Sequence, residues 1–156
     1  MKLINIMQML FIFCFPAAGD SITRILHYNP ADADIQMENG WAVVEMPGFQ
    51  QRGIPGTPLL PAVPEVFILP DGAKNITFSV VPLEVTEISI PGFRVIPATE
   101  LRPFGSPALY PERLPDPFVY SSDSPWPANP VIAVHTGTLS GIRVASCLLQ
   151  PWVYLP

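Results

Sequence analysis

GIPGTPLLPAVPEVFILPDGA, at residues 53–73, is the most strongly patterned stretch of the chain. Prolines recur in it at every third residue: Pro55, Pro58, Pro61 and Pro64. This spacing favours an extended, polyproline-like run, which is stiff before it docks on anything. The run leads into a short apolar strand at residues 66–69 and closes on a Pro-Asp-Gly turn. Because no catalytic motif lies in the stretch, we expect it to fix the architecture of a β module rather than to carry chemistry.

The composition of the whole chain favours an all-β domain. Of its 156 residues, 49% are hydrophobic and only 13% are charged, which argues against disorder. Proline accounts for 21 residues, and a proline inside a helix removes a hydrogen bond and clashes with the preceding turn. The length suits one domain. We therefore predict an all-β, antiparallel module, sandwich-like or barrel-like, with long proline-rich loops.

Several segments have the composition or alternation of β-strands. They are residues 20–28, 41–46, 75–81, 83–90, 93–96, 131–138 and 142–149. The last two predict a hairpin, and Asn39-Gly40 predicts a tight turn. Pro82 is expected to end a strand, and a change of alternation in residues 83–90 predicts a bulge near Glu87.

Residues 97–130 differ from the rest because prolines interrupt them throughout. Loops of this length in compact domains are usually functional or flexible. Aromatic residues lie between the prolines, which favours an ordered loop that packs on the domain or on a partner. This segment, called the excursion below, is where we expect contact with a partner.

The N-terminus has the pattern of an export signal. Lys2 gives a positive start, residues 3–15 form a mostly apolar run, and Ala17 and Gly19 supply small residues at the −3 and −1 positions. We predict a signal peptide at residues 1–19 and the domain at residues 20–156. The alternative is that the run is a buried strand or helix of the core. The run is shorter than the ~20 residues of a membrane-spanning helix, so no stable membrane insertion is expected once the signal is removed.

Motifs for catalysis, metal binding and nucleic-acid binding are missing from the sequence. The net charge is −5 and no basic run occurs, so nucleic acid is not an expected partner. Cys147 and His135 would form a nucleophile pair only with a third, orienting group, and the favoured interpretation is a buried structural cysteine. Asp32 and Asp34 are too few for a calcium loop and are interpreted as a solvated turn. We therefore expect no catalytic residues, cofactor or metal.

Five segments form a recognisable set: GTPLLP (56–61), LPDGA (69–73), YP (110–111), TLSGIRVA (138–145) and QPWVYLP (150–156). Together they resemble the N-terminal prodomain of gingipain-type cysteine peptidases, which have a caspase-like catalytic domain. The resemblance spans most of the chain, with Leu155 where the family's closing motif has asparagine.

The resemblance implies a non-catalytic prodomain of a secreted bacterial peptidase, at the cell surface, in the periplasm or outside the cell. Such a prodomain assists folding of the catalytic domain and keeps it latent, in cis or in trans. That catalytic domain is not expected within this chain, which is either a truncated precursor or a stand-alone protein. The resemblance implies that such a prodomain blocks the active-site cleft with a basic side chain in the specificity pocket, for which Arg113 is the first candidate and Arg102 the second. A bidentate pair with a pocket carboxylate would suit either arginine, and the alternative is that both merely solubilise a loop.

A competing function class is a secreted β-sandwich module for adhesion or carbohydrate binding. In that interpretation the aromatic residues Tyr110, Tyr120 and Trp126 of the excursion would stack on sugar rings.

Overall fold

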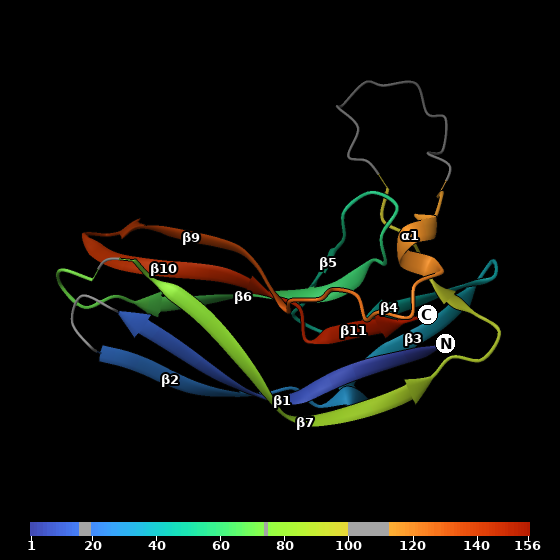
Figure 1. Ribbon diagram of the computed structural model, residues 1–156, viewed down its shortest axis with the longest axis horizontal. Coiled ribbons are helices and arrows are strands. Elements are labelled where there is room, and N and C mark those ends of the chain that lie inside the picture. Colours follow the sequence, from blue (N-terminus) through green and yellow to red (C-terminus); the bar gives the residue numbers. More distant parts are fainter. Residues whose placement is uncertain (16–19, 74, 100–112) are drawn as a thin grey trace, which may run out of the picture.

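The computed structural model describes residues 1–15, 20–73, 75–99 and 113–156, and almost all of its regular structure is β-strand (Figure 1). The strands are β1 (Lys2–Phe15), β2 (Asp20–His27), β3 (Asp34–Glu38), β4 (Trp41–Glu45), β5 (Gln50–Arg52), β6 (Leu60–Ile68), β7 (Thr77–Ser89), β8 (Arg94–Val95), β9 (Val131–Leu139), β10 (Ile142–Leu149) and β11 (Trp152–Leu155). Two short helical turns, η1 (Pro30–Asp32) and α1 (Pro117–Tyr120), accompany them. No helix in these ranges has the length and apolar character needed to cross a membrane.

The strands form three open sheets, so the predicted antiparallel all-β fold is confirmed in its sandwich-like rather than its barrel-like form. The first sheet has the order β11-β1-β2, with β7 also paired to β1, and the second has the order β5-β6-β10-β9. The third has the order β3-β4-β8, in which β4 and β8 run parallel. In Figure 1 the second sheet runs above the first, and the two chain ends lie at the same end as α1.

Two clusters of buried side chains hold the sheets together. The first lies between the first and second sheets and includes Ile6, Phe67 and Leu149. The second lies towards the chain ends and includes Trp152 and Tyr154, both fully buried. Strands β1, β6 and β11 contribute to both clusters, so the two cores are continuous through these strands.

The N-terminal run is a strand of the first sheet. β1 pairs with β7 along one edge, and with β11 and then β2 along the other. The structure thus describes residues 2–15 as a strand, while the signal peptide at residues 1–19 stays a prediction. Residues 16–19, which contain the proposed cleavage site, lie outside the described residues, and cleavage after Gly19 stays a prediction.

The polyproline-like run was predicted to continue through Pro61 and Pro64. Both prolines instead belong to strand β6, which begins at Leu60. β5 pairs with residues 60–62 and β10 pairs with residues 63–68. Each proline of β6, Pro61 and Pro64, thus belongs to one of these ladders only. A strand tolerates a residue without an N–H group where one of its edges is not used.

Irregular pairing occurs beside Pro82 rather than near Glu87. β7 continues through Pro82, which pairs with Met9, and Glu87 pairs regularly with Ile4. The register shifts fall between these two points, around Gln8 and its partner Glu84. A residue that cannot donate to the ladder explains why the bulge forms there.

The predicted hairpin and the predicted tight turn are confirmed, but several short elements escaped prediction, β3 and α1 among them. β9 and β10 form the expected hairpin, and Asn39 and Gly40 have φ of 49° and 83°, as a tight primed turn requires. β3 was missed because its sequence, DIQME, is polar and mostly exposed. The single turn of α1 lies within the excursion, where Asp116 caps it and Pro117 occupies its first turn.

Candidate partner interface

The described segments that lead into and out of residues 100–112 are called the first and second stems of the excursion. The loop at residues 53–59 contacts both stems through a single residue, Gly56. The Gly56 N–H donates to the Ala98 carbonyl at 2.9 Å, and the Gly56 carbonyl accepts from the Asp116 N–H at 2.8 Å. Ala98 precedes residues 100–112, which lie outside the described residues, and Asp116 follows them. We call this pair of bonds the Gly56 clamp.

Glycine is favoured at the clamp by its backbone conformation, and a Cβ there would already touch the second stem. Gly56 has a φ of +86°, a backbone conformation that residues with a Cβ rarely adopt. A Cβ there would lie 3.4 Å from the Leu114 carbonyl oxygen and 3.4 Å from the Asp116 Cβ. At the start of the same loop, a Cβ on Gly53 would come within 2.8 Å of the Ala98 Cβ. The glycines of this stretch therefore allow the stems to approach the loop.

Thr57 fixes the loop from inside. Its side chain is buried, and its hydroxyl donates to the Ile54 carbonyl at 2.8 Å while accepting from the Ile54 N–H at 3.0 Å. The Thr57 carbonyl accepts from the Ala98 N–H at 2.8 Å, and an isolated β-bridge joins Pro58 to Pro97. The GTP sequence at residues 56–58 thus forms a rigid base for the excursion.

The second stem is tied to the core through α1. The Asp116 carboxylate accepts from the Phe118 N–H at 2.9 Å and so caps the turn. Tyr120 is buried, its hydroxyl donates to the Val95 carbonyl at 2.7 Å, and its ring packs against Tyr154. Burial, with Tyr154 nearby, raises the pKa of Tyr120. Tyr120 is therefore structural, and its assignment as a sugar-stacking residue was wrong.

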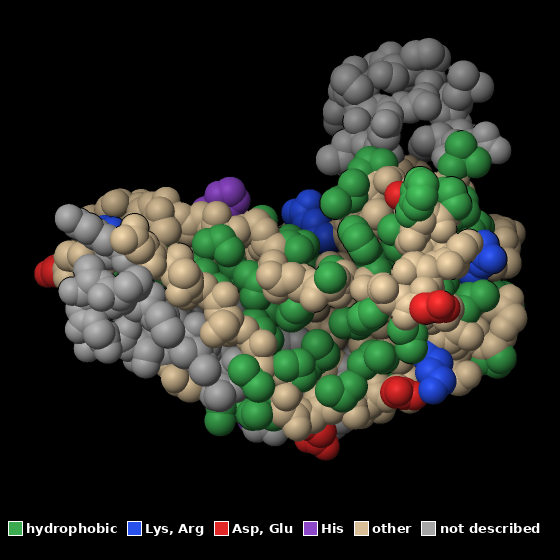
Figure 2. Space-filling view, in the orientation of Figure 1, with side chains coloured by type: hydrophobic (Ala, Val, Ile, Leu, Met, Phe, Trp, Pro, Cys, Tyr) green, Lys and Arg blue, Asp and Glu red, His purple; other side chains and the backbone are tan. Residues whose placement is uncertain are grey.

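Large apolar side chains are exposed around this rigid base. Ile54 and Leu114 are each 63% exposed, and Phe118 is 89% exposed. We call these three residues the apolar rim. Figure 2 shows hydrophobic side chains gathered at this end of the molecule, over α1. Because folding gains little from such exposed groups, their presence on fixed backbone is typical of a surface that contacts another molecule.

Arg113 lies at the foot of the second stem. It is exposed and lines a hollow of about 180 Å³ together with Gly53, Leu59 and Thr99. Within the described ranges, no ion pair joins Arg113 to another residue. Arg102, Tyr110 and the YP pair lie outside the described residues. The structure thus places the first inhibitory candidate beside the clamp.

A second hollow, more apolar, also borders the loop at Gly53 and Ile54. It has a volume of about 410 Å³, and its lining includes Ile54, Trp126, Pro127 and Ile132. Trp126 is half-buried, and its backbone exchanges two hydrogen bonds with Tyr154, of 2.9 and 2.7 Å. Of the two described residues proposed to stack on sugars, Tyr120 is buried and Trp126 is partly exposed.

The cysteine and histidine considered as a nucleophile pair do not form one. Cys147 is 3% exposed, and burial, with a smaller contribution from Glu65, raises the pKa of its thiol to about 12. His135 is exposed on β9 and pairs in register with Ser146. Successive residues of a strand face opposite sides, so Cys147 points away from the His135 side. The interpretation of Cys147 as a buried structural thiol is confirmed.

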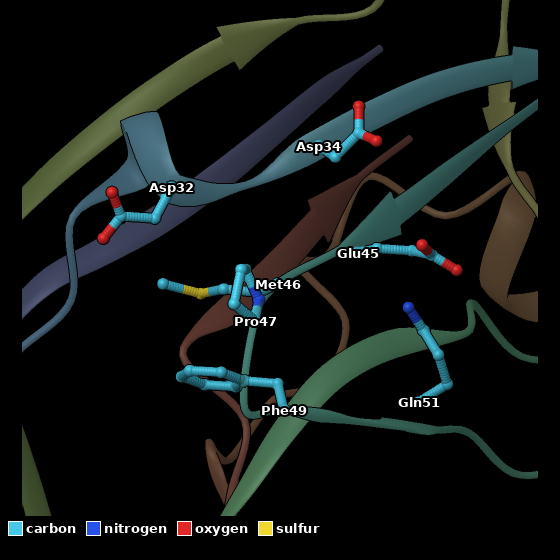
Figure 3. A pocket seen from close by; sticks show the side chains of 7 residues that line it. All are labelled: Asp32, Asp34, Glu45, Met46, Pro47, Phe49 and Gln51. Atoms are coloured by element: carbon cyan, nitrogen blue, oxygen red, sulfur yellow. The ribbon is translucent and has the colours of Figure 1, made fainter.

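An acidic hollow of about 430 Å³ lies near η1 and is lined by Asp32, Asp34 and Glu45. Figure 3 shows their carboxylates pointing in different directions. Asp32 accepts from the Asn29 amide at 3.2 Å, and Asp34 accepts from the Gln36 amide at 2.6 Å. In the described part of the chain, no group of three or more His, Cys, Asp or Glu is arranged to hold a metal ion.

Sequence reasoning missed the clamp and the apolar rim. Gly56 was noticed only as part of a motif, because its bonds to Ala98 and Asp116 depend on tertiary structure. The turn α1 that carries Phe118 had a usable signal, because Asp116-Pro117 is a typical helix start.

Comparison with known proteins gives a structural match and no sequence match. No family model matches the chain, and no curated protein does. Among solved structures, it is similar to a chain of one described as "Structural insight into zymogenic latency of gingipain K from Porphyromonas gingivalis". The TM-score is 0.55 at 21% sequence identity, and the match covers 79% of this chain and 70% of that chain. The resemblance stated from the sequence is confirmed at the level of the fold, which is similar to that of a chain in this gingipain K zymogen study.

Proposed function

We propose that the chain is a non-catalytic prodomain that binds the catalytic domain of a gingipain-like cysteine peptidase, assists its folding and keeps it latent. The observation that carries the proposal is the apolar rim, which stands exposed on a base fixed by the Gly56 clamp. The fold supports it, because the similar solved structure concerns the latency of a gingipain zymogen.

The rim would supply most of the binding energy. Full burial of a large apolar side chain stabilises a complex by about 1.5–3 kcal/mol. Phe118 lies in the capped turn α1, whose end is held to the core by Tyr120, so docking costs little conformational entropy. Exposed aromatic residues on rigid backbone are typical of the few residues that dominate an interface.

Latency would come from an arginine beside the rim. In this proposal Arg113, with Arg102 as the second candidate, enters the specificity pocket of the peptidase and pairs with a carboxylate there. Pro156 lies at the same end of the molecule as α1 (Figure 1), so a catalytic domain joined after it would begin near the rim. The contact therefore suits attachment in cis as well as binding in trans, in a bacterial protein that is secreted, periplasmic or at the cell surface.

An inhibition titration tests the role of Arg113. The purified chain is added to a gingipain-type catalytic domain, and cleavage of a short peptide substrate is followed. We expect inhibition by the parent chain and at least tenfold weaker inhibition by Arg113→Ala, because a desolvated charge pair is lost. Leu139→Ala, which truncates an exposed residue at the end of β9, at the opposite end of the molecule, is the control. An Arg113→Ala protein that inhibits as well as the parent would exclude this residue.

The carbohydrate-binding alternative is tested separately, by screening the chain on a glycan array. Binding to sugars that is lost in Trp126→Ala, without binding to the peptidase domain, would favour that alternative.

A further inference from the structure

Strand β1 occupies the centre of the first sheet. β7 pairs with it from Lys2 to Cys14, and the opposite edge is shared by β11, at residues 2–5, and β2, at residues 8–15. The Ile6 N–H also donates to the Pro151 carbonyl at 2.9 Å. No other strand of the first sheet has partners along both edges in the described ladders.

β1 also contributes to both hydrophobic clusters. Leu3 is fully buried in the cluster that contains Trp152 and Tyr154. Ile6 is 5% exposed in the cluster that contains Phe67. The segment therefore supplies backbone pairing to three strands and side chains to two cores.

The same segment has the sequence of an export signal, and cleavage after Gly19 would remove it. The remaining sheet would then have β7 on one side and β2 with β11 on the other. Neighbouring strands lie about 4.8 Å apart, so the gap between these edges would be about 9–10 Å wide. Unpaired N–H and C=O groups would face the gap from both sides, and such edges readily pair with another chain.

We propose that the position of β1 is a strand-acceptor site, which removal of residues 1–19 opens. Its ligand is an extended, mostly apolar polypeptide segment that lies antiparallel to β7 and has aliphatic side chains where Leu3 and Ile6 lie. β1 itself is the argument for this ligand, because it already fills the site with these features. Main-chain hydrogen bonds would give affinity and the two buried positions specificity, as in other additions of a strand to a sheet. The site is separate from the apolar rim, so it stands or falls independently of the proposed peptidase contact.

A strand-exchange experiment on the full chain tests the proposal. A specific protease site replaces residues 16–19, and the folded protein is cut there. A fluorescent peptide of residues 1–15, made soluble by added C-terminal lysines, is then offered during brief exposure to mild denaturant. Two variant peptides accompany it. One carries Leu3→Asp and Ile6→Asp, and the other carries Lys2→Gln, which removes only the exposed ion pair with Glu87.

We expect the cut chain to exchange its own strand for one labelled peptide per chain. The Leu3→Asp and Ile6→Asp peptide should bind at least about a hundredfold more weakly, since each buried side chain is worth roughly a factor of ten or more. The Lys2→Gln peptide should bind within about fivefold of the parent. If the segment leaves and neither the sheet content by circular dichroism nor the melting temperature changes, the proposal is wrong. Failure to take up the peptide, whether the cut chain unfolds or forms dimers, would overturn it as well.

Discussion

Two proline-rich stretches meet at the Gly56 clamp, and they present their side chains in opposite ways. In the inner stretch, residues 56–64, Thr57, Pro58, Leu60 and Pro61 are buried. In the outer stretch, residues 113–118, Arg113, Leu114, Pro117 and Phe118 are exposed. Both stretches are fixed by hydrogen bonds, so composition alone does not separate a scaffold from a contact surface. The two roles are distinguished by whether the residues between the prolines are buried or exposed.

Truncation of one leucine in each stretch should give the largest difference in stability between the two stretches. Leu60→Ala is expected to lower the free energy of unfolding by about 2–5 kcal/mol, because Leu60 is fully buried. Leu114→Ala should change it by no more than about 0.5 kcal/mol. Urea unfolding of both variants measures the difference, and equal losses would show that the two stretches are not distinct.

Substitution of the clamp should affect both stretches at once. Gly56→Ala is expected to destabilise the chain by about 1–3 kcal/mol, because alanine at a φ of +86° is strained and its Cβ meets the second stem. It should also weaken inhibition of the peptidase, since the rim loses its base. Gly137→Ala is the control, because a Cβ there meets nothing within 4 Å. Unchanged unfolding of Gly56→Ala would show that the clamp is not required.

Alkaline pH should lower the folding stability of the chain through Cys147, whose register partner is Glu65 of β6. The thiol has an ordinary pKa of 9.0 and a pKa of about 12 in the folded chain. Between these values the unfolded chain releases the proton first, so stability is complete below pH 9 and falls as the pH rises above it. Cys147→Ala should lose stability less steeply than the parent between pH 9 and 11, measured by urea unfolding at several pH values. Parallel curves for the two proteins would contradict the assignment.

Truncation of Phe118 should have the smallest effect on the fold. Because its ring is 89% exposed, Phe118→Ala should shift the free energy of unfolding by less than about 0.5 kcal/mol. Inhibition of the peptidase should nevertheless weaken at least tenfold, as for a dominant interface residue. Loss of stability without loss of inhibition would mean that Phe118 belongs to the scaffold.

The sequence predicts the parts of this fold that depend on local patterns. The hairpin of β9 and β10 and the turn at Asn39-Gly40 follow from strand composition and turn chemistry, and the all-β class followed from the apolar, proline-rich composition. β3 has no apolar alternation to reveal it, because it pairs with β4 while exposing most of its side chains. The extent of β6 was hidden because its prolines favour a different extended structure, and only pairing with β5 and β10 reveals it.

The candidate interface was predicted only in outline. Contact through the excursion was expected, and Arg113 does lie at its foot. The clamp depends on hydrogen bonds between residues more than forty positions apart in the sequence, which no local pattern encodes. The exposure of Phe118 depends on how α1 is held to the core by Tyr120. Likewise, the N-terminal run has the same apolar composition in an export signal and in a central strand, so composition does not distinguish the two.

The central claim is that the end of the molecule that carries the rim binds a peptidase catalytic domain. Hydrogen exchange of the chain, alone and with a gingipain-type catalytic domain, measures this most directly. We predict slower exchange in residues 53–59 and 113–120 on complex formation, and no change in the turn between β9 and β10. Protection of that turn with none at residues 53–59 and 113–120, or no complex at all, would contradict the account.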